Sequence, residues 1–314
     1  MAQADFAHDV RTGLTAARKW LPPRWFYDEL GSSLFDAICF LPEYYVMRAE
    51  TEVLTSFRRE IAASLGPQVR LVELGSGMAR KTRILLDVLT ASQPSLEYVP
   101  VDVDASMLER SGRALLADYA RLRIHAVCAD FTVPAIPLRM LGPQRGRTVV
   151  LFLGSTIGNL DPAEAQSMLR DLHDALAPGD ALLLGADLRK SKSILEPAYD
   201  DALGVTAAFN LNILARINRE LGGTFALDAF RHRALYDEAR GRIEMHLVSR
   251  RAQRVRIEAL ELEIAFAEGE SIHTESSYKH DDETLAALAS AAGFRIEKAW
   301  TDARKWFADV LMVV

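Results

Sequence analysis

The sequence predicts an α/β fold: a parallel sheet covered by helices on both faces, beside a second region of α+β character. Three observations support this prediction. Between residues 69 and 187, apolar segments of strand length alternate with helical patterns. A polar side chain lies at or just past the end of each apolar segment, and after residue 190 short alternating segments replace this rhythm. Continuously apolar strands are typical of parallel sheets that are buried on both sides.

The first part of the chain leads into the sheet through helices and aromatic loops. Helical patterns cover residues 1–20, 34–40 and 48–65, with a turn at 31–33 and prolines interrupting them. The connecting loops 24–28 and 41–45 are rich in aromatic residues. A simple nucleotide-binding fold does not require such loops, although their tyrosines could also be packing residues with hydroxyl groups at the surface.

Five strands and three helices are expected in the central region. The strands are 69–74, 98–104, 124–128, 148–153 and 181–187, and the helices are 82–91, 106–119 and 162–177. In parallel sheets the ligand binds beyond the carboxyl ends of the strands. Polar residues stand at or just past all five ends, namely Glu73, Asp102, Asp130, Asn159 and Asp187. One such residue would be routine, but five predict a ligand-binding crevice.

A glycine turn, Gly75-Ser76-Gly77, follows the first strand. Glycines let the backbone pass close to a ligand, and the helix that follows offers unpaired N–H groups. This signal is weak alone, because many α/β proteins use such turns only to reverse the chain. Asp102, 25 residues after Gly77, could bind the ribose of either a nicotinamide dinucleotide or adenosylmethionine.

Two details favour adenosylmethionine. The turn lacks the third glycine of the dinucleotide fingerprint and the Gly-Lys-Ser/Thr end of a phosphate-binding loop. The pair Asp130-Phe131 suits the edge and the ring face of an adenine. Methyl transfer also explains why no Ser/His/Asp set, paired glutamates or metal cluster stands out. The sulfonium is an activated leaving group, so the enzyme has mainly to align a neutral nucleophile with the methyl group.

The later part of the chain predicts the second region. A long helical pattern covers 195–221, and alternating segments follow at 230–236, 242–249 and 255–266. We expect a loop around Glu275, then a helix at 282–292 and a closing hairpin at 294–301 and 308–314. The expected domains are residues 1–48 plus 195–279, which bind substrate, and residues 49–194 plus 280–314, which carry the central sheet.

Composition restricts the partners. The chain has 314 residues, a net charge of −6 and no Lys/Arg block, which argues against nucleic acid. We expect no secretory signal, and no apolar run reaches membrane-spanning length. Cys39 and Cys128 lie in apolar contexts, so we expect both to be buried free thiols. His125 lies in a strand, and we expect it to be buried too. We therefore expect a soluble, cytoplasmic protein that binds neither nucleic acid nor membranes. We also expect a monomer.

Several longer motifs carry a resemblance that spans nearly the whole chain. They are Leu-Pro-Pro-Arg-Trp-Phe-Tyr-Asp at 21–28, Leu-Pro-Glu-Tyr-Tyr at 41–45, Glu-Leu-Gly-Ser-Gly at 73–77, Phe-Leu-Gly-Ser-Thr-Ile-Gly-Asn-Leu at 152–160, Ala-Tyr-Asp-Asp-Ala at 198–202, Gly-Val-Thr-Ala-Ala-Phe-Asn at 204–210, Arg-Ile-Glu-Met at 242–245 and Thr-Glu-Ser-Ser at 274–277. With these motifs the chain resembles the histidine-specific, adenosylmethionine (SAM)-dependent methyltransferases of ergothioneine biosynthesis, the L-histidine Nα-methyltransferase family.

The resemblance implies a Rossmann-like class I methyltransferase sheet and three methyl transfers to the α-amino nitrogen of L-histidine, giving hercynine. It implies SAM as methyl donor, no metal, and donor contacts from Gly75, Lys81, Asp102, Asp130 and Phe131. Around the amino-acid end of the substrate it implies Tyr27, Tyr44, Asn159 and Tyr199, with Tyr27 and Asn159 as catalytic residues.

For the imidazole, the resemblance implies hydrogen bonds with Glu275 and Ser277, and Met245 packing against the ring. A carboxylate and a hydroxyl can satisfy both ring nitrogens, and such a site penalises a side chain that lacks them. The chain departs from the family pattern at Ser276, where we expect valine, so Ser276 is expected to add a polar group near the ring.

Other functions stay open at this point. The chain could methylate another aromatic amino acid or a different nitrogen of histidine. It could also be a non-catalytic SAM-binding protein, although the tyrosines of the amino-acid pocket are all present. An NAD-dependent dehydrogenase is disfavoured by the missing third glycine and by Asp130-Phe131.

Overall fold

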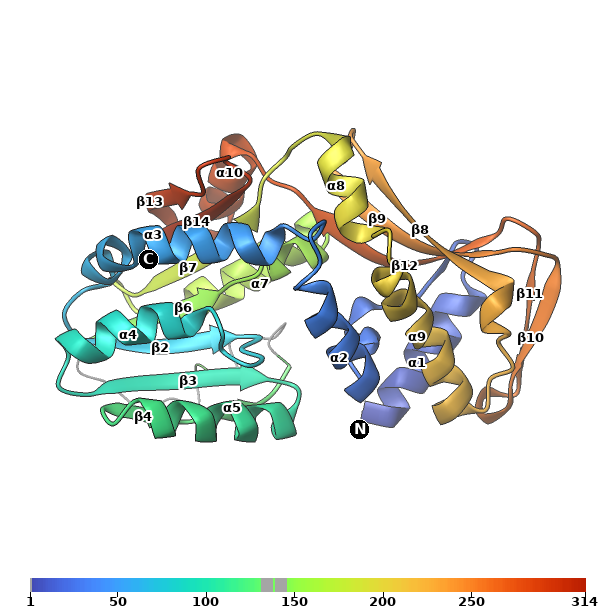
Figure 1. The fold of residues 1–314 in the computed structure, drawn as a ribbon, viewed down its shortest axis with the longest axis horizontal. Helices are drawn as coiled ribbons and strands as arrows, with labels where there is room; N and C mark the ends of the chain where they lie inside the picture. Colours follow the sequence, from blue (N-terminus) through green and yellow to red (C-terminus); the bar gives the residue numbers. More distant parts are fainter. Residues whose placement is uncertain (1, 131–137, 139–145) are drawn as a thin grey trace. The chain divides into compact units, whose positions relative to one another are not determined.

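The computed structural model describes residues 2–130, 138 and 146–314 (Figure 1). The chain forms two compact units. Unit one comprises Met1–Tyr45 and Lys190–Tyr278, and unit two comprises Val46–Arg189 and Lys279–Val314. These bounds lie within a few residues of the two expected domains.

Unit two contains an eight-stranded sheet, which confirms the predicted α/β class. The strand order is β13-β14-β7-β6-β2-β3-β4, and β5 also pairs with β3. The four central strands run parallel: β2 (Val69–Leu74), β3 (Leu96–Asp102), β6 (Arg147–Phe152) and β7 (Ala181–Asp187). β13 (Arg295–Thr301) and β14 (Phe307–Val313) form the predicted closing hairpin, and β14 pairs antiparallel with β7.

The third predicted strand is wrong in its length. It consists of two short pieces, β4 (Leu122–Ile124) and β5 (Val127–Cys128), which both pair with β3. This edge of the sheet is partly open to solvent. His125 and Cys128 are therefore exposed, against expectation, whereas Cys39 is buried as predicted and both thiols are free.

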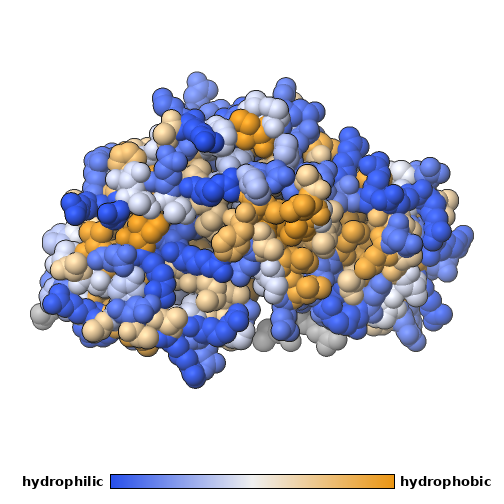
Figure 2. All heavy atoms as spheres, in the orientation of Figure 1, coloured by the Kyte–Doolittle hydropathy of each residue, from blue (hydrophilic) through white to orange (hydrophobic). Residues whose placement is uncertain are grey.

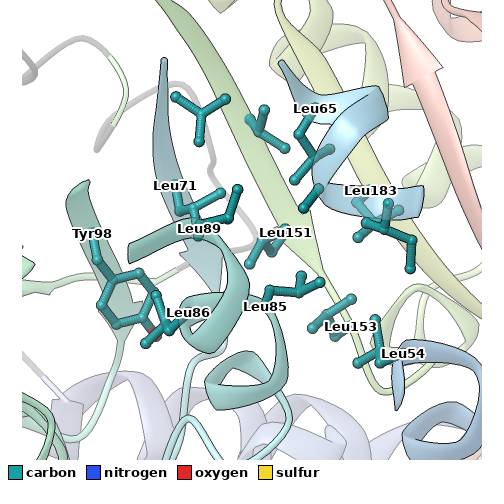
Figure 3. Close-up of a cluster of buried hydrophobic side chains, with 14 of the residues drawn as sticks. Leu54, Leu65, Leu71, Leu85, Leu86, Leu89, Tyr98, Leu151, Leu153 and Leu183 are labelled. Atoms are coloured by element: carbon teal, nitrogen blue, oxygen red, sulfur yellow. The ribbon is translucent and has the colours of Figure 1, made fainter. Parts of the chain in front are cut away.

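Helices cover both faces of this sheet. α3 (Val46–Leu65), α4 (Thr82–Ser92) and Leu115 of α5 (Ala105–Asp118) share one apolar cluster with the sheet (Figure 3). α7 (Pro162–Ala175) and α10 (Asp282–Ala292) share a second cluster. Neighbouring residues of one strand enter opposite clusters, as Leu71 and Val72 do. Burial on both faces explains why these strands read as continuous apolar runs.

Unit one has a four-stranded sheet of order β1-β12-β9-β8 and a separate β10-β11 hairpin. Its strands are β1 (Lys19–Trp20), β8 (Phe230–Asp237), β9 (Arg242–Ser249), β10 (Gln253–Ile257), β11 (Leu262–Phe266) and β12 (Ser271–Tyr278). Its helices are α1 (Ala2–Thr15), α2 (Glu29–Ile38), α8 (Lys192–Tyr199) and α9 (Val205–Leu221).

Three predictions for unit one are wrong. The expected loop around Glu275 is strand β12. The turn expected at 31–33 lies inside α2, because the Asp28 carboxylate accepts a hydrogen bond from the Gly31 amide at 2.7 Å and caps the helix earlier. The helix expected at 195–221 is two helices. Asp201 caps α9 by accepting from the Val205 and Thr206 amides at 3.0 and 2.7 Å.

The face shown in Figure 2 carries mostly hydrophilic residues, with apolar residues gathered in areas among them. Over the described ranges, each helix is either too short or too polar to cross a membrane.

Candidate active site

The sheet of unit two changes direction between β2 and β6. These strands are neighbours, but β2 is followed by β3 on one side, whereas β6 is followed by β7 on the other (Figure 1). Ligands of open α/β sheets bind at the carboxyl ends of the strands at such a switch point. The loops after β2 and β6 are therefore the first candidates for a binding site.

The loop after β2 is shaped by two glycines with positive φ, Gly75 at 71° and Gly77 at 49°. Their backbone is tied to β3, because the Gly75 amide donates to the Val101 carbonyl at 2.9 Å and the Gly77 amide donates to Asp102 Oδ2 at 2.9 Å. Among the described residues, no atom beyond the chain neighbours of Gly77 comes within 4 Å of a Cβ added there. The turn therefore needs glycine for its conformation and leaves room above the backbone.

Asp102 and Asp130 follow adjacent parts of the sheet. Asp102 ends β3 and is half-buried, whereas Asp130 is exposed and follows β5, which pairs with β3 at Asp102 and Cys128. Phe131, expected beside the adenine, lies outside the described residues. The two carboxylates thus stand at the same edge of the sheet as the glycine turn.

Lys81 stands immediately before α4 and is largely buried. Its ammonium forms an ion pair with Glu50 of α3, whose side chain is fully buried. The same glutamate accepts a hydrogen bond from the Gly154 amide at 2.7 Å. Glu50 was not among the residues predicted for the site.

Two of the five polar strand ends are internal, which corrects the expectation that all five line a crevice. Glu73 is buried and accepts hydrogen bonds from Tyr98 and, at 2.7 Å, from Thr82. Burial raises the pKa of Glu73 to about 7 against the lowering effect of these bonds. Asp187 pairs with Lys279 at 2.7 Å, and both side chains are fully buried.

Asn159 ends the 3₁₀ turn η2 (Thr156–Asn159) after β6 and is partly buried. Ser155, just before the turn, has a left-handed backbone with φ 57°, and its hydroxyl accepts the Asp187 amide at 2.9 Å. A non-glycine residue in this conformation is strained, and such strain is typical of functional loops. Asn159 is therefore held at the carboxyl edge of β6.

In unit one, the predicted tyrosines belong to one aromatic group. The Phe35 ring contacts Tyr27 and Tyr44 edge-on at centroid distances of 5.6 and 6.2 Å, and Tyr44 contacts Tyr199 edge-on at 6.1 Å. Burial raises the pKa of Tyr44 well above its usual value, and Tyr199, Cys39, Tyr27 and Glu275 add to the effect. The Tyr44 hydroxyl is therefore uncharged at neutral pH.

A bulge at Thr274 decides which residues of β12 share a face. Before it, His273 pairs with His246; after it, Glu275 pairs with Met245 and Ser276 with Glu244. Directly opposed residues point to the same face of a sheet. Glu275 and Met245 therefore share one face of the sheet.

Ser277 lies on that same face, two residues beyond Glu275, and its hydroxyl shares a 2.9 Å hydrogen bond with the Tyr199 hydroxyl. Ser276 lies on the opposite face, where its hydroxyl contacts His273 Nε2 at 3.1 Å. The structure thus brings together Glu275, Ser277, Met245 and Tyr199, and separates Ser276 from them.

A polar chain behind Tyr199 escaped prediction. His232 Nε2 lies 2.8 Å from the Tyr199 carbonyl, and His232 Nδ1 lies 2.8 Å from the Asn210 side-chain nitrogen. A carbonyl only accepts, so Nε2 carries the proton and Nδ1 accepts from Asn210. Burial lowers the pKa of His232, in keeping with this neutral form. Sequence offers no signal for it, because His232 sits in an ordinary alternating strand.

Among the residues that the structure describes, no cluster of three or more His, Cys, Asp or Glu side chains could hold a metal ion.

Known proteins resemble this chain over most of its length. The sequence profile described as "Histidine-specific methyltransferase, SAM-dependent" matches residues 6–314. Histidine N-alpha-methyltransferase of Mycolicibacterium smegmatis is 51% identical, covering 94% of this chain and 90% of that protein. Its counterpart in Mycobacterium tuberculosis is 47% identical with the same coverage. The CcbJ methyltransferase structure from Streptomyces caelestis is 18% identical, with TM-score 0.46, over 82% of this chain and 95% of that one.

Proposed function

The chain belongs to the family of histidine-specific, SAM-dependent methyltransferases, and on that premise we propose that it methylates the α-amino nitrogen of L-histidine. We propose three successive transfers, which give hercynine for ergothioneine biosynthesis. Ergothioneine biosynthesis protein 1 of Neurospora crassa, 29% identical over 90% of this chain and 32% of that protein, supports this pathway.

We assign donor binding to unit two. The glycine turn leaves room above its backbone, and Asp102 stands where its carboxylate could accept hydrogen bonds from ribose hydroxyls. Asp130 and Phe131 are assigned to the adenine, and Gly75 and Lys81 to the remainder of the donor. SAM supplies a methyl group on a sulfonium, and the protein has to orient it.

We assign acceptor binding to unit one. The observation that carries this assignment is the shared face of Glu275, Met245 and Ser277, with Ser277 bonded to Tyr199. A carboxylate and a hydroxyl on one face can bind both nitrogens of an imidazole, and Met245 can pack against the ring. Ser276 is assigned a structural role, in which its hydrogen bond with His273 stabilises strand β12.

Neutral groups are proposed to hold the amino-acid end of histidine. Tyr27 and Tyr44 offer phenol hydroxyls, and Asn159 offers an amide; Tyr27 and Asn159 are assigned to orient the attacking nitrogen. None of them places a fixed cation beside the sulfonium. Aromatic faces also attract the trimethylammonium group that accumulates. The reaction needs no metal in this scheme, and we propose a monomer that requires neither nucleic acid nor membrane.

Mass analysis of products tests the reaction. Purified protein is incubated with SAM and each standard amino acid in turn, and histidine alone should gain methyl groups. Methylation of tryptophan or tyrosine instead would support the rival aromatic substrates, and SAM binding without any product would support a non-catalytic role.

Calorimetry tests the imidazole assignment. Glu275→Ala should weaken histidine binding by about 1–3 kcal/mol, because a charge-assisted hydrogen bond is lost. Glu263→Ala is the control, since Glu263 lies in unit one but is exposed and pairs with Arg254. Equal histidine affinities in the two variants would remove Glu275 from the site.

A further inference from the structure

Glu50 joins the two loops that flank the switch point of the sheet. Lys81 belongs to the loop after β2, and Gly154 is the second residue of the loop after β6. One carboxylate oxygen of Glu50 accepts from the Lys81 ammonium, and the other accepts from the Gly154 amide at 2.7 Å. Glu50 itself lies on α3 and has no accessible surface. Both loops therefore share one buried anchor.

The surrounding strands are built to admit this carboxylate. A Cβ at Gly185 of β7 would collide with Glu50 Oε1. Asp309 of β14, directly opposite Gly185, is also fully buried. Burial raises the pKa of Asp309 well above its usual value, and the charge of Glu50 raises it further, whereas Lys81 lowers it. Lys81 is the cation that pairs with Glu50.

We propose that Glu50 is a positioning residue for methyl transfer. It fixes the position of the loop that contains Lys81 relative to the loop that contains Asn159, on the two sides of the switch point. Through Lys81 it orients the donor loop. Through the Gly154 amide it fixes the start of the strained segment that leads to Asn159, five residues later. This inference rests on the proposed roles of Lys81 and Asn159.

Two substitutions separate the contact of Glu50 with Lys81 from its contact with Gly154. Glu50→Gln keeps an oxygen for the Gly154 amide but turns an amide nitrogen toward Lys81, so only the contact with Lys81 is lost. Glu50→Met loses both contacts. Glu60→Gln is the control, because Glu60 lies on the same helix and pairs with Lys298, but both side chains are exposed. It removes the same charge without touching the two loops.

The readouts are the SAM dissociation constant by calorimetry, the KM for histidine, and the melting temperature. Relative to Glu60→Gln, Glu50→Gln should weaken SAM binding about tenfold or more, since a buried charge loses its partner, with little change in the KM for histidine. Glu50→Met should weaken SAM binding and also raise the KM for histidine. A purely structural role would instead lower the melting temperature and leave the affinity of folded molecules unchanged.

Gly185→Ala offers a second route that leaves Glu50 in the sequence. Its methyl group should displace the carboxylate and weaken SAM binding as Glu50→Gln does. Gly112→Ala is its control, because a Cβ there meets no atom within 4 Å in the part of the chain that the structure describes. SAM affinities of Glu50→Gln and Gly185→Ala that equal those of their controls would overturn the inference while leaving histidine methylation intact. If the wild type methylates another amino acid, the SAM measurements still decide the role of Glu50.

Discussion

The candidate residues of the two units are held in different ways. In unit two, the loops beyond β2, β6 and β7 are fixed by buried charges, in the pairs Lys81–Glu50 and Lys279–Asp187. In unit one, the residues around Tyr199 are fixed by uncharged groups: Ser277 at its hydroxyl, His232 at its carbonyl, and the Tyr44 ring.

This difference matches the chemistry assigned to each unit. A buried ion pair is costly to assemble but strongly penalises the loss of either partner, so it defines one loop geometry. Neutral hydrogen bonds and aromatic edges are individually weaker than a buried ion pair. Such surroundings can accept a primary amine and, after methylation, a permanent cation. Three predictions test the contrast, in order of decreasing effect.

The largest effect is expected from the Lys279–Asp187 pair. Lys279→Met should lower the free energy of unfolding by about 3–5 kcal/mol, because the buried Asp187 carboxylate loses its counter-charge. Urea unfolding measures this. Lys298→Met is the matched control and should cost far less, since its pair with Glu60 is exposed and screened by solvent. Equal losses in the two variants would contradict the importance of buried charge in unit two.

A slightly smaller effect, visible only as pH dependence, is expected from Glu73. Its pKa rises from 4.5 when the chain is unfolded to about 7 in the folded protein. Folding therefore favours the protonated form, and this stabilisation is present below pH 4.5 and is lost as pH rises through 7. The shift corresponds to about 3 kcal/mol.

Urea unfolding between pH 4.5 and pH 8 checks this prediction. Glu73→Gln should remove the part of the loss of unfolding free energy at high pH that Glu73 causes. The difference in unfolding free energy between wild type and variant should therefore change with pH. A difference that stays constant over this range would show that Glu73 keeps an ordinary pKa.

The smallest effect is expected in unit one. Tyr199→Phe should lower the free energy of unfolding by about 0.5–1.5 kcal/mol, because it loses a neutral hydrogen bond with Ser277. A double-mutant cycle with Ser277→Ala isolates the pair, and its coupling energy should not depend on salt concentration. A coupling of several kcal/mol, or one that falls steeply with salt, would erase the contrast between the units.

Most of unit two could be predicted from sequence, because its strands carry their signal locally. The bounds predicted for β2 and β7 are those observed, since strands buried on both faces are apolar at every position. The break between α8 and α9 also had a local signal in Asp201 and Gly204, which was outweighed by the helical periodicity around it.

Strand β12 could not be recognised in this way. Its residues 273–277 are polar on both faces, because one face carries histidine contacts and the other carries Glu275 and Ser277. Glu50 was missed for a similar reason: a glutamate on an amphipathic helix is ordinarily interpreted as solvent-exposed. Their importance depends on which loops and strands meet them in space, and the roles of Glu275 and Ser277 were available only through resemblance.

The bulge in β12 has a consequence for how this protein can change in length. A regular ladder would align Glu275 with Glu244 and set two carboxylates side by side. The extra residue, Thr274, moves every later side chain by one position along the partner strand. Removing Thr274 would leave the strand pairs on both sides of the bulge as they are. By contrast, one deletion or insertion between Thr274 and Ser277 would turn Glu275 or Ser277 to the face opposite Met245. Through evolution or engineering, β12 can therefore exchange many side chains but gain or lose single residues at few places.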